Sequence, residues 1–321
     1  MPDGEGCRAH RPLRVVAGAA MTGDTTAGGG ASAADLFAEH RPLLFSVAYE
    51  ILGSVADSED VLQESYLRWR EVDPAGVENP RAYLARIVTR QALNALRAAS
   101  RRREEYVGPW LPEPLEAPSG DGPAEHVLTG EAVTTAMLLV LESLTPVERA
   151  VFVLREVFDF GYPEIAAAVD RSEAAARQIA HRARGHVQAR RPRAVAEPAL
   201  AQGVAERFLV AAATGDVQGL MDVLAPEVVF LGDGGGVVSA ARRPVHGADR
   251  VARLVAGLFR KGTAMGELGM RFGVFNGMPA IVVALDGVVD LVLCVEVRGE
   301  TVTGVYNVRN PEKLGDIRIS G

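Results

Sequence analysis

The residues between Arg171 and Arg193 carry side chains that suit contacts with nucleic acid. This segment contains seven arginines and one acidic residue, Glu173, within a chain of 321 residues whose formal net charge is −7. Arginine binds phosphate oxygens and can donate two hydrogen bonds to the edge of a guanine. We expect the DNA-reading surface to comprise Arg171, Ser172, Arg177, Gln178, His181, Arg182 and Arg184.

Three predicted helices would position these side chains. Thr145 followed by Pro146 is typical of a helix start, because threonine can cap the first turn and proline suits the first helical position. We expect these helices over residues 146–158, 162–169 and 173–187.

Small residues on the inner side of the last of these helices support the arrangement. Ala176, Ala180 and Ala183 would let two helices cross closely. A tight turn before Ser172 and a basic outer face are typical of a helix-turn-helix, whose last helix enters the major groove. The alternative, a purely structural three-helix module, accounts less well for the basic face.

Positive charge is concentrated in a second segment as well. Residues 81–103 contain seven arginines and no acidic residue, whereas residues 35–80 have a net charge of −7 and residues 104–170 a net charge of −11. Two basic stripes between acidic blocks are typical of a nucleic-acid-binding protein with two contact points. A pair of solvated, salt-bridged helix faces is the alternative interpretation.

The second basic stripe belongs to a predicted helical domain over residues 34–103. Gly53 can end its first helix, and Ser54 or Asp57 can cap the next one. Trp69 and Tyr83 suit either core packing or base stacking, and we favour core packing.

Two linkers are predicted. Residues 104–130 are rich in proline and glycine, as expected of a linker, and residues 191–198 form a shorter one after the helical domain over 131–190. The first linker also contains Trp110, Leu111 and Leu115, which could form a docking segment or an incidental hydrophobic anchor.

The pattern changes between residues 200 and 321. Apolar, β-branched runs are separated by Asn276-Gly277 and Asp286-Gly287, which are hairpin signals. We predict an α+β domain in which a few helices pack against a curved antiparallel sheet, so the fold class is multidomain, all-α followed by α+β. Its helices are expected near residues 201–214, 216–224 and 248–260.

Composition limits the remaining possibilities. Cys7 and Cys294 lie at opposite ends, with neither metal-ligand spacing nor a disulfide framework, which indicates a reducing cytoplasm and no metal or other cofactor. No apolar run is long enough to span a bilayer. Residues 1–33 are expected to be a disordered leader, with Met21 as an alternative start.

In this order, the motifs resemble those of bacterial extracytoplasmic-function sigma factors, specifically the group with a fused C-terminal SnoaL-like, or NTF2-like, domain. LFAEHRPLLFSVAYEILGSVADSEDVLQESYLRW and NPRAYLARIVTRQALNALR resemble the sigma-2 domain, and LTPVERAVFVLREVFDFGYPEIAAAVDRSEAAARQIAHRAR resembles the sigma-4 domain. The pieces VGPWLPEPL, DGGG and NPEKL resemble signatures of the fused group. One departure is Val237, where lysine often follows the glycine-rich motif.

The resemblance implies an alternative sigma factor without catalytic groups. It would bind core RNA polymerase, direct promoter-specific initiation and be modulated by its own C-terminal domain. The polymerase-binding residues would be Asp57, Glu59, Asp60, Gln63 and Glu64. Contacts with the downstream promoter element and its melting would come from Asn79, Arg81, Arg86, Arg90 and Arg97. Regulatory contacts would come from Trp110, Leu111, Pro112, Asp233, Gly234, Gly235, Gly236, Asn310, Pro311, Lys313 and Leu314.

Two other functions stay open at this point. A ligand-responsive DNA-binding regulator would need only the helix-turn-helix and a sensor. A cyclase or isomerase would need an acid/base pair, for which the candidates are Asp222, Asp233, His246 and Asp290. A SnoaL-like domain would also offer an apolar pocket for a small apolar ligand.

Overall fold

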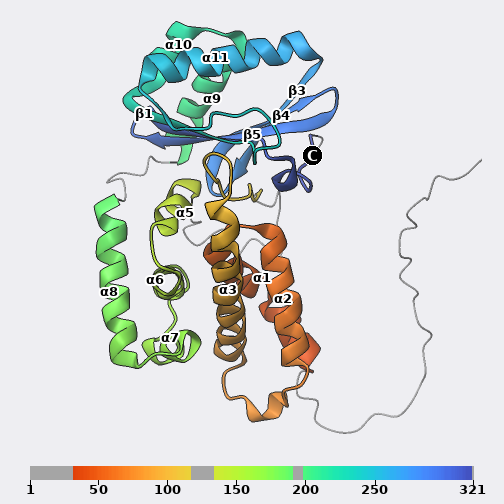
Figure 1. Ribbon diagram of the computed structural model, residues 1–321, viewed down its shortest axis with the longest axis vertical. Helices are drawn as coiled ribbons and strands as arrows, with labels where there is room; N and C mark the ends of the chain where they lie inside the picture. The colour runs from red at the N-terminus through yellow and green to blue at the C-terminus, as the bar shows by residue number, and fades with distance from the viewer. Residues whose placement is uncertain (1–31, 117–133, 191–197, 320–321) are drawn as a thin grey trace, which may run out of the picture. The chain divides into compact units, whose positions relative to one another are not determined.

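The first helical domain consists of three long helices joined by short connections. The computed structural model describes residues 32–116, 134–190 and 198–319; the predicted leader and parts of both predicted linkers lie outside them. Figure 1 shows the elements of this domain in red to yellow. They are α1 (Ala33–Leu52), α2 (Val55–Trp69), the 3₁₀ turn η1 (Pro74–Gly76) and α3 (Pro80–Glu104).

Local sequence explains where these helices begin and end. Ser32 and Asp35 form a capping box at the start of α1, and Gly53 ends the helix in a left-handed conformation with φ of 70°. Of the two candidate caps for α2, Ser54 is the one that accepts a hydrogen bond from the first turn. Trp69 is fully buried and donates its ring N–H to the carbonyl of Ala33, so it packs in the core.

The second helical domain contains α5 (Thr135–Glu142), α6 (Pro146–Phe152), the π-helical turn η2 (Val153–Val157), α7 (Tyr162–Val169) and α8 (Glu173–Arg190). The predicted bounds of α7 are confirmed, and Thr145 forms a capping box with Glu148. The prediction of a single α-helix over 146–158 was wrong, because its second half is π-helical.

The two helical domains share one hydrophobic core. Helix α3 packs against α6 and α7, which lie beside it in Figure 1. Helix α1 packs against α6 and η2. Buried residues of both domains, such as Leu44, Leu84, Leu138 and Ile165, belong to one continuous cluster. The two predicted DNA-binding units therefore contact each other directly.

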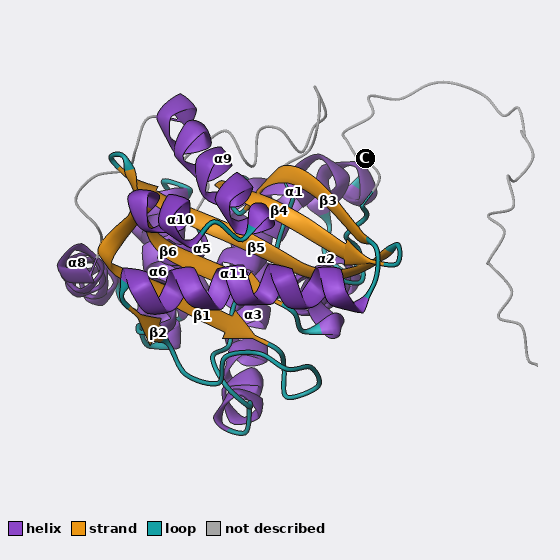
Figure 2. Cartoon of the chain, turned by 90° about the horizontal axis from the view of Figure 1, so that it is seen from above, coloured by secondary structure: helices purple, strands orange, loops and turns teal. Residues whose placement is uncertain are grey.

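The C-terminal domain is a six-stranded sheet with helices across one face, as Figure 2 shows from above. Its helices are α9 (Pro198–Thr214), α10 (Val217–Val223) and α11 (Ala248–Met265). Its strands are β1 (Leu224–Asp233), β2 (Val245–His246), β3 (Leu268–Phe275), β4 (Met278–Leu285), β5 (Val288–Arg298) and β6 (Thr301–Val308). Among all the residues that the structure describes, no helix is long and apolar enough to cross a membrane.

The order of the strands is β2-β1-β6-β5-β4-β3, and β1 pairs with β6 in parallel. The expected α+β class is confirmed, but the expectation of a wholly antiparallel sheet was wrong for this pair. Parallel neighbours need a long connection, and here α11 and four strands separate β1 from β6 along the chain.

The two faces of the sheet bury different residues. One face packs against α9, α10 and α11 around Phe208, Phe230 and Phe259. The other face buries Leu111 of the linker together with Leu314 and Ile317 from the end of the chain. The linker thus forms part of the core of the C-terminal domain.

Candidate nucleic-acid interface and its contacts

Helix α8 carries the predicted upstream surface. Its inner residues Ala176, Ala180 and Ala183 are buried against the domain core. Six of the seven predicted DNA-reading residues are exposed and Arg184 is half-buried. Ser172 accepts a hydrogen bond from the amide of Ala175, which caps the helix at the end expected to meet DNA.

Several arginines of this surface already have partners within the second helical domain. Arg177 forms an ion pair with Glu173 at 2.5 Å and lies 4.3 Å from the ring centre of Tyr162. Arg184 forms an ion pair with Glu156 at 2.6 Å, whose hydrogen bond raises the pKa of Arg184 further. These contacts orient the guanidinium groups while the surface remains open to solvent.

The predicted downstream residues are engaged differently. Arg81 donates to the carbonyl of Phe158 at 3.2 Å, and Arg90 donates to the carbonyl of Ala167 at 2.9 Å. Asn79 donates to the carboxylate of Glu164 at 3.1 Å. All three acceptors belong to the second helical domain.

Arg86 and Arg97 make contacts within the first helical domain instead. Arg86 lies 4.5 Å from the ring centre of Tyr83, and Arg97 donates to Asn94 at 3.1 Å. The five predicted downstream residues therefore do not form one open surface.

The predicted polymerase-binding residues lie along α2. Glu59, Asp60, Gln63 and Glu64 are exposed, and Asp57 is half-buried in the first turn. Glu59 pairs with Arg41 at 2.6 Å, and Glu64 accepts from Gln91 at 2.6 Å. The helix thus presents an acidic face to solvent.

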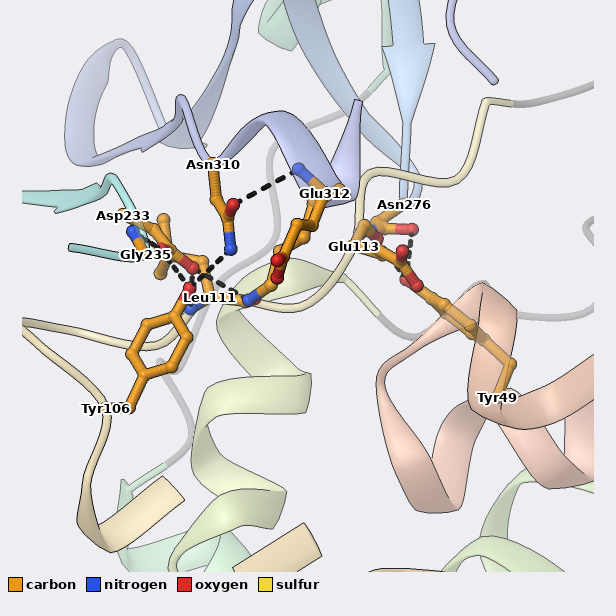
Figure 3. Close-up of polar contacts among 10 residues, drawn as sticks. Tyr49, Tyr106, Leu111, Glu113, Asp233, Gly235, Asn276, Asn310 and Glu312 are labelled. Carbon is orange, nitrogen blue, oxygen red and sulfur yellow. Dashed lines mark hydrogen bonds and ion pairs between the residues drawn. The ribbon is translucent and has the colours of Figure 1, made fainter. Parts of the chain in front are cut away.

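Several of the predicted regulatory residues meet at the carboxylate of Asp233, in a set of contacts that we call the Asp233 junction (Figure 3). Asp233 is fully buried at the end of β1. Its oxygens accept hydrogen bonds from Tyr106 Oη at 2.6 Å, from the amide of Leu111 at 2.9 Å and from the amide of Gly235 at 3.0 Å. A carboxylate of the C-terminal domain thus holds two residues of the linker.

Lys313 completes the Asp233 junction from the end of the chain. Its ammonium group lies 2.8 Å from Asp233 Oδ2 and donates to the carbonyl of Leu111 at 2.6 Å. The same group lies 4.3 Å from the ring centre of Trp110, within the range of a cation–π interaction. Asn310 adds a hydrogen bond to Tyr106 Oη at 2.9 Å.

Close packing explains why two positions near the linker are glycines. A Cβ atom on Gly235, which has φ of 62°, would lie 2.5 Å from Asn310 Nδ2. A Cβ atom on Gly53 would lie 2.7 Å from the ring of Trp110, so the linker also touches the end of α1. Pro112 lies in the same described stretch of the linker, and Pro311 begins the turn that carries Lys313.

A second set of contacts, the Asn276 junction, was not predicted. The Tyr49 hydroxyl of α1 donates to the carbonyl of Glu113 at 2.6 Å and lies 3.0 Å from Asn276 Oδ1. The Asn276 side chain also accepts from the amide of Leu115 at 3.1 Å and donates to Thr135 Oγ1 at 3.3 Å. Asn276 therefore connects the sheet with α1, the linker and α5, as Figure 3 shows in part.

Two of the residues that sequence reasoning missed are tyrosines held as hydrogen-bond donors. Burial, with Asp233 as the next cause, raises the pKa of Tyr106 well above its ordinary value. Burial likewise raises the pKa of Tyr49. Both hydroxyls therefore keep their protons over the physiological range and can donate to the oxygens that face them.

The acid/base candidates do not form a pair. Asp222 and His246 are exposed, Asp233 is occupied by the linker, and Asp290 pairs with Arg309 at 2.6 Å. A cavity of about 250 Å³ lies between linker residues Val107 and Gly108 and the loop that follows β1. Its other lining residues are Gly232, Gly234, Gly236, Val237, Val238, Ser239, Ala240, Ala241 and Arg242, so it differs from the predicted apolar pocket.

Comparisons with known proteins agree with this arrangement. The family model of sigma-70 region 2 matches residues 36–102, and that of sigma-70 region 4 matches residues 134–187. The ECF RNA polymerase sigma factor SigJ of Mycobacterium tuberculosis is 36% identical over 290 residues, which cover 85% of this chain and 90% of that protein. The probable ECF RNA polymerase sigma factor SigI of the same species is 30% identical over 282 residues, covering 87% and 93%.

A solved structure extends the similarity to the whole fold. The crystal structure of the Mycobacterium tuberculosis extracytoplasmic function sigma factor SigJ matches with a TM-score of 0.72 and 33% identity. The match covers 88% of this chain and 98% of that one, and therefore includes the C-terminal domain.

Proposed function

The chain belongs to the extracytoplasmic-function RNA polymerase sigma factors, and from this premise we propose how its C-terminal domain controls it. As an alternative sigma factor it is a transcription initiation factor rather than an enzyme, and its partners are core RNA polymerase and promoter DNA. We propose that the C-terminal domain holds region 2 (α1–α3) and region 4 (α5–α8) in a closed arrangement that does not read a promoter.

One observation carries this proposal. Arg81 and Arg90, two of the predicted contacts with the downstream element, donate their hydrogen bonds to backbone carbonyls of region 4. Each bond uses one of the five N–H donors of the guanidinium and holds the group against region 4, whose backbone then limits the approach of a phosphate or a base edge. Reading the downstream element would therefore require region 4 to move away from α3.

The Asp233 junction and the Asn276 junction would hold region 2 and region 4 together. The Asp233 junction holds Tyr106 and Leu111 of the linker, and the Asn276 junction holds α1, the linker and α5 at one side chain. Because the linker joins region 2 to region 4, fixing it on the sheet limits how far the two regions can separate. The C-terminal domain would thus act without a separate inhibitory protein.

The other site assignments follow from the same proposal. In the open arrangement, the exposed residues of α8 would read the upstream element, with Arg177, Arg182 and Arg184 contacting bases or phosphates. The acidic face of α2 would dock on core RNA polymerase. Its exposure in the closed arrangement would allow docking before release.

In vitro transcription with core RNA polymerase and the promoter region of the protein's own gene tests the proposal. Asp233→Asn removes the charge that holds Lys313 and weakens the hold on the linker, so we expect more specific transcript than from the unmodified chain. Glu296→Gln is the matched control, because Glu296 accepts from Tyr306 within the same sheet and has no hydrogen bond or ion pair with the described part of the linker. Equal transcript from the unmodified chain and a folded Asp233→Asn variant would contradict the restraint.

We also propose that the C-terminal domain can bind a small apolar ligand. Phe208, Phe230 and Phe259 are buried between the helices and the sheet, so a ligand there would have to displace a ring. An increase in the melting temperature of the protein with a panel of small apolar compounds would support such a ligand.

A further inference from the structure

A buried glutamate lies at the contact between region 2 and region 4. Glu50 belongs to α1, and only 9% of it is exposed. Its Oε2 atom has no hydrogen-bond partner among the described residues. An ionised carboxylate in such surroundings would be strongly disfavoured.

The opposing charge comes from region 4. Arg149 of α6 is 1% exposed and donates its Nε–H to the backbone carbonyl of Glu50 at 3.0 Å. Its Nη1 forms an ion pair with Glu142 of α5, whose side chain is 24% exposed. Its Nη2 is buried without a partner among the described residues.

The charges of this cluster do not balance when both carboxylates are ionised. The cluster then holds one positive and two negative charges. Arg149 forms its ion pair with Glu142, whereas it binds Glu50 through the backbone carbonyl and leaves the buried carboxylate without an ion pair among the described residues. Burial, opposed by Arg149, raises the pKa of Glu50 to about 8 from the ordinary value of 4.5. A proton on Glu50 leaves the cluster neutral.

Charged groups on the other elements packed against α1 are engaged elsewhere. Glu64 of α2 accepts from Gln91, and Arg90 of α3 donates to Ala167. On η2, Arg155 pairs with Asp159 and Glu156 pairs with Arg184. Next to Glu50 on α1, the Tyr49 hydroxyl faces Glu113 and Asn276. Arg149 is therefore the charge that acts on Glu50 across the contact.

We propose that Glu50 and Arg149 form a proton-sensitive latch between region 2 and region 4, which closes when Glu50 is protonated and is weakened when it ionises. Separation of the two regions would bring Glu50 to solvent, where it ionises at its ordinary pKa. Closing therefore takes up a proton between about pH 4.5 and pH 8. The closed arrangement is most stable in acid and loses stability as the pH rises through 8.

The size of the effect follows from the two pKa values of Glu50. Between pH 6 and pH 8 the ratio of open to closed molecules would rise by at most about 50-fold. The link from opening to promoter reading depends on the function proposed above. The opening itself is measured without polymerase or promoter, so failure of the latch and failure of that function are distinguishable.

Energy transfer between two dyes on the full chain measures the opening. Ala75 in η1 and Ala189 in α8 are exposed and are changed to cysteine for labelling, in a Cys7→Ser background; Cys294 is buried. We expect transfer to fall as the pH rises from 6 to 8. Glu50→Gln mimics the protonated side chain, so its transfer should stay high and independent of pH. Glu39→Gln, an exposed substitution on the same helix, should respond like the unmodified chain.

A pH-independent transfer in the unmodified chain, or the same pH response in Glu50→Gln, would overturn the proposal. If Glu50→Gln does not fold, infrared spectroscopy of the unmodified chain tests the proposal instead. With isotopically labelled glutamate, the unmodified chain should show a protonated carboxyl band at pH 7 that disappears with a midpoint near pH 8. Absence of that band at pH 7 would also overturn the latch.

Discussion

A single hydroxyl group connects the linker with two segments of the C-terminal domain. Tyr106 Oη donates to Asp233 and accepts from Asn310, although 127 and 204 residues separate these partners along the chain. A hydrogen bond to a charged group contributes roughly 1.5–3 kcal/mol of net stability. The hydrogen bond from Tyr106 to Asp233 therefore helps to hold the linker on the sheet, yet it can break when the linker moves.

Tyr106→Phe should release this part of the linker. We expect the free energy of unfolding to fall by about 1–3 kcal/mol and the amide of Leu111 to exchange its hydrogen faster. Tyr306→Phe is the control, because Tyr306 donates to Glu296 within the sheet. It should also lose stability but leave exchange at Leu111 unchanged. Slow exchange at Leu111 in both variants would argue against a role of Tyr106 in holding the linker.

Gly53 is a second position where one residue joins two segments. Its φ of 70° and the Trp110 ring, which would lie 2.7 Å from an added Cβ atom, leave no room for a side chain. Gly53→Ala should lower the free energy of unfolding by more than about 1 kcal/mol. Gly203→Ala, in α9 with no atom near the added methyl, should instead raise it by about 0.5–1 kcal/mol. Chemical denaturation measures both, and equal effects would contradict this account.

At the scale of elements, α8 and the turn that precedes it present a row of arginines. Arg171 and Arg182 are exposed and, beyond the carbonyl of Asp170 and a 3.9 Å approach to Glu148, make few contacts that would compete with DNA. Arg177 and Arg184 are held by carboxylates of their own domain. The first pair is therefore the better candidate for phosphate contacts.

Arg171→Ala and Arg182→Ala should weaken binding of the polymerase-bound protein to a promoter fragment. Each lost phosphate contact should reduce the slope of log affinity against log salt by about 0.9. A salt titration of binding measures the slope. Gln188→Ala, an exposed substitution on α8, should leave the slope unchanged. An unchanged slope in both arginine variants would place the phosphate contacts elsewhere.

Local sequence predicts most helices, because their ends depend on neighbouring residues. The caps at Thr145 and Gly53 and the bounds of α7 follow from the types of a few adjacent side chains. The π-helical turn η2 and the parallel pairing of β1 with β6 do not, since both depend on packing between segments far apart in the chain.

The same reasoning applies to the candidate sites. The acidic and basic helix faces follow from local sequence and helical spacing. The Asn276 junction could not be predicted, because its contact with Tyr49 spans 227 residues and Asn276-Gly277 is already explained as a hairpin turn. Because the hairpin turn already accounts for an asparagine at this position, the sequence does not indicate that Asn276 also contacts distant segments.

At the scale of the whole molecule, the linker belongs to two cores. Leu111 is fully buried against the sheet, and Leu115 packs against the helical core. The sheet and the two regions are therefore coupled through one segment whose removal from either core would loosen both.

Leu111→Asp should separate the linker from the sheet, because a buried, unpaired charge costs several kcal/mol. We expect a larger hydrodynamic radius and faster proteolysis between region 2 and region 4. Val107→Asp is the control, because Val107 is 47% exposed, so we expect a charge there to stay in contact with water. If both variants keep the original radius, the linker does not hold the molecule closed.

The chain contains two lysines, Lys261 and Lys313. Lys261 is exposed on α11, whereas Lys313 is 10% exposed within the Asp233 junction. An amine-selective acylating reagent therefore has, apart from the α-amine, one accessible target and one protected target in the same molecule. The ratio of label on Lys313 to label on Lys261, read by mass spectrometry, would report the state of the junction in living cells, and acylation of Lys313 would itself prevent the ion pair from forming again.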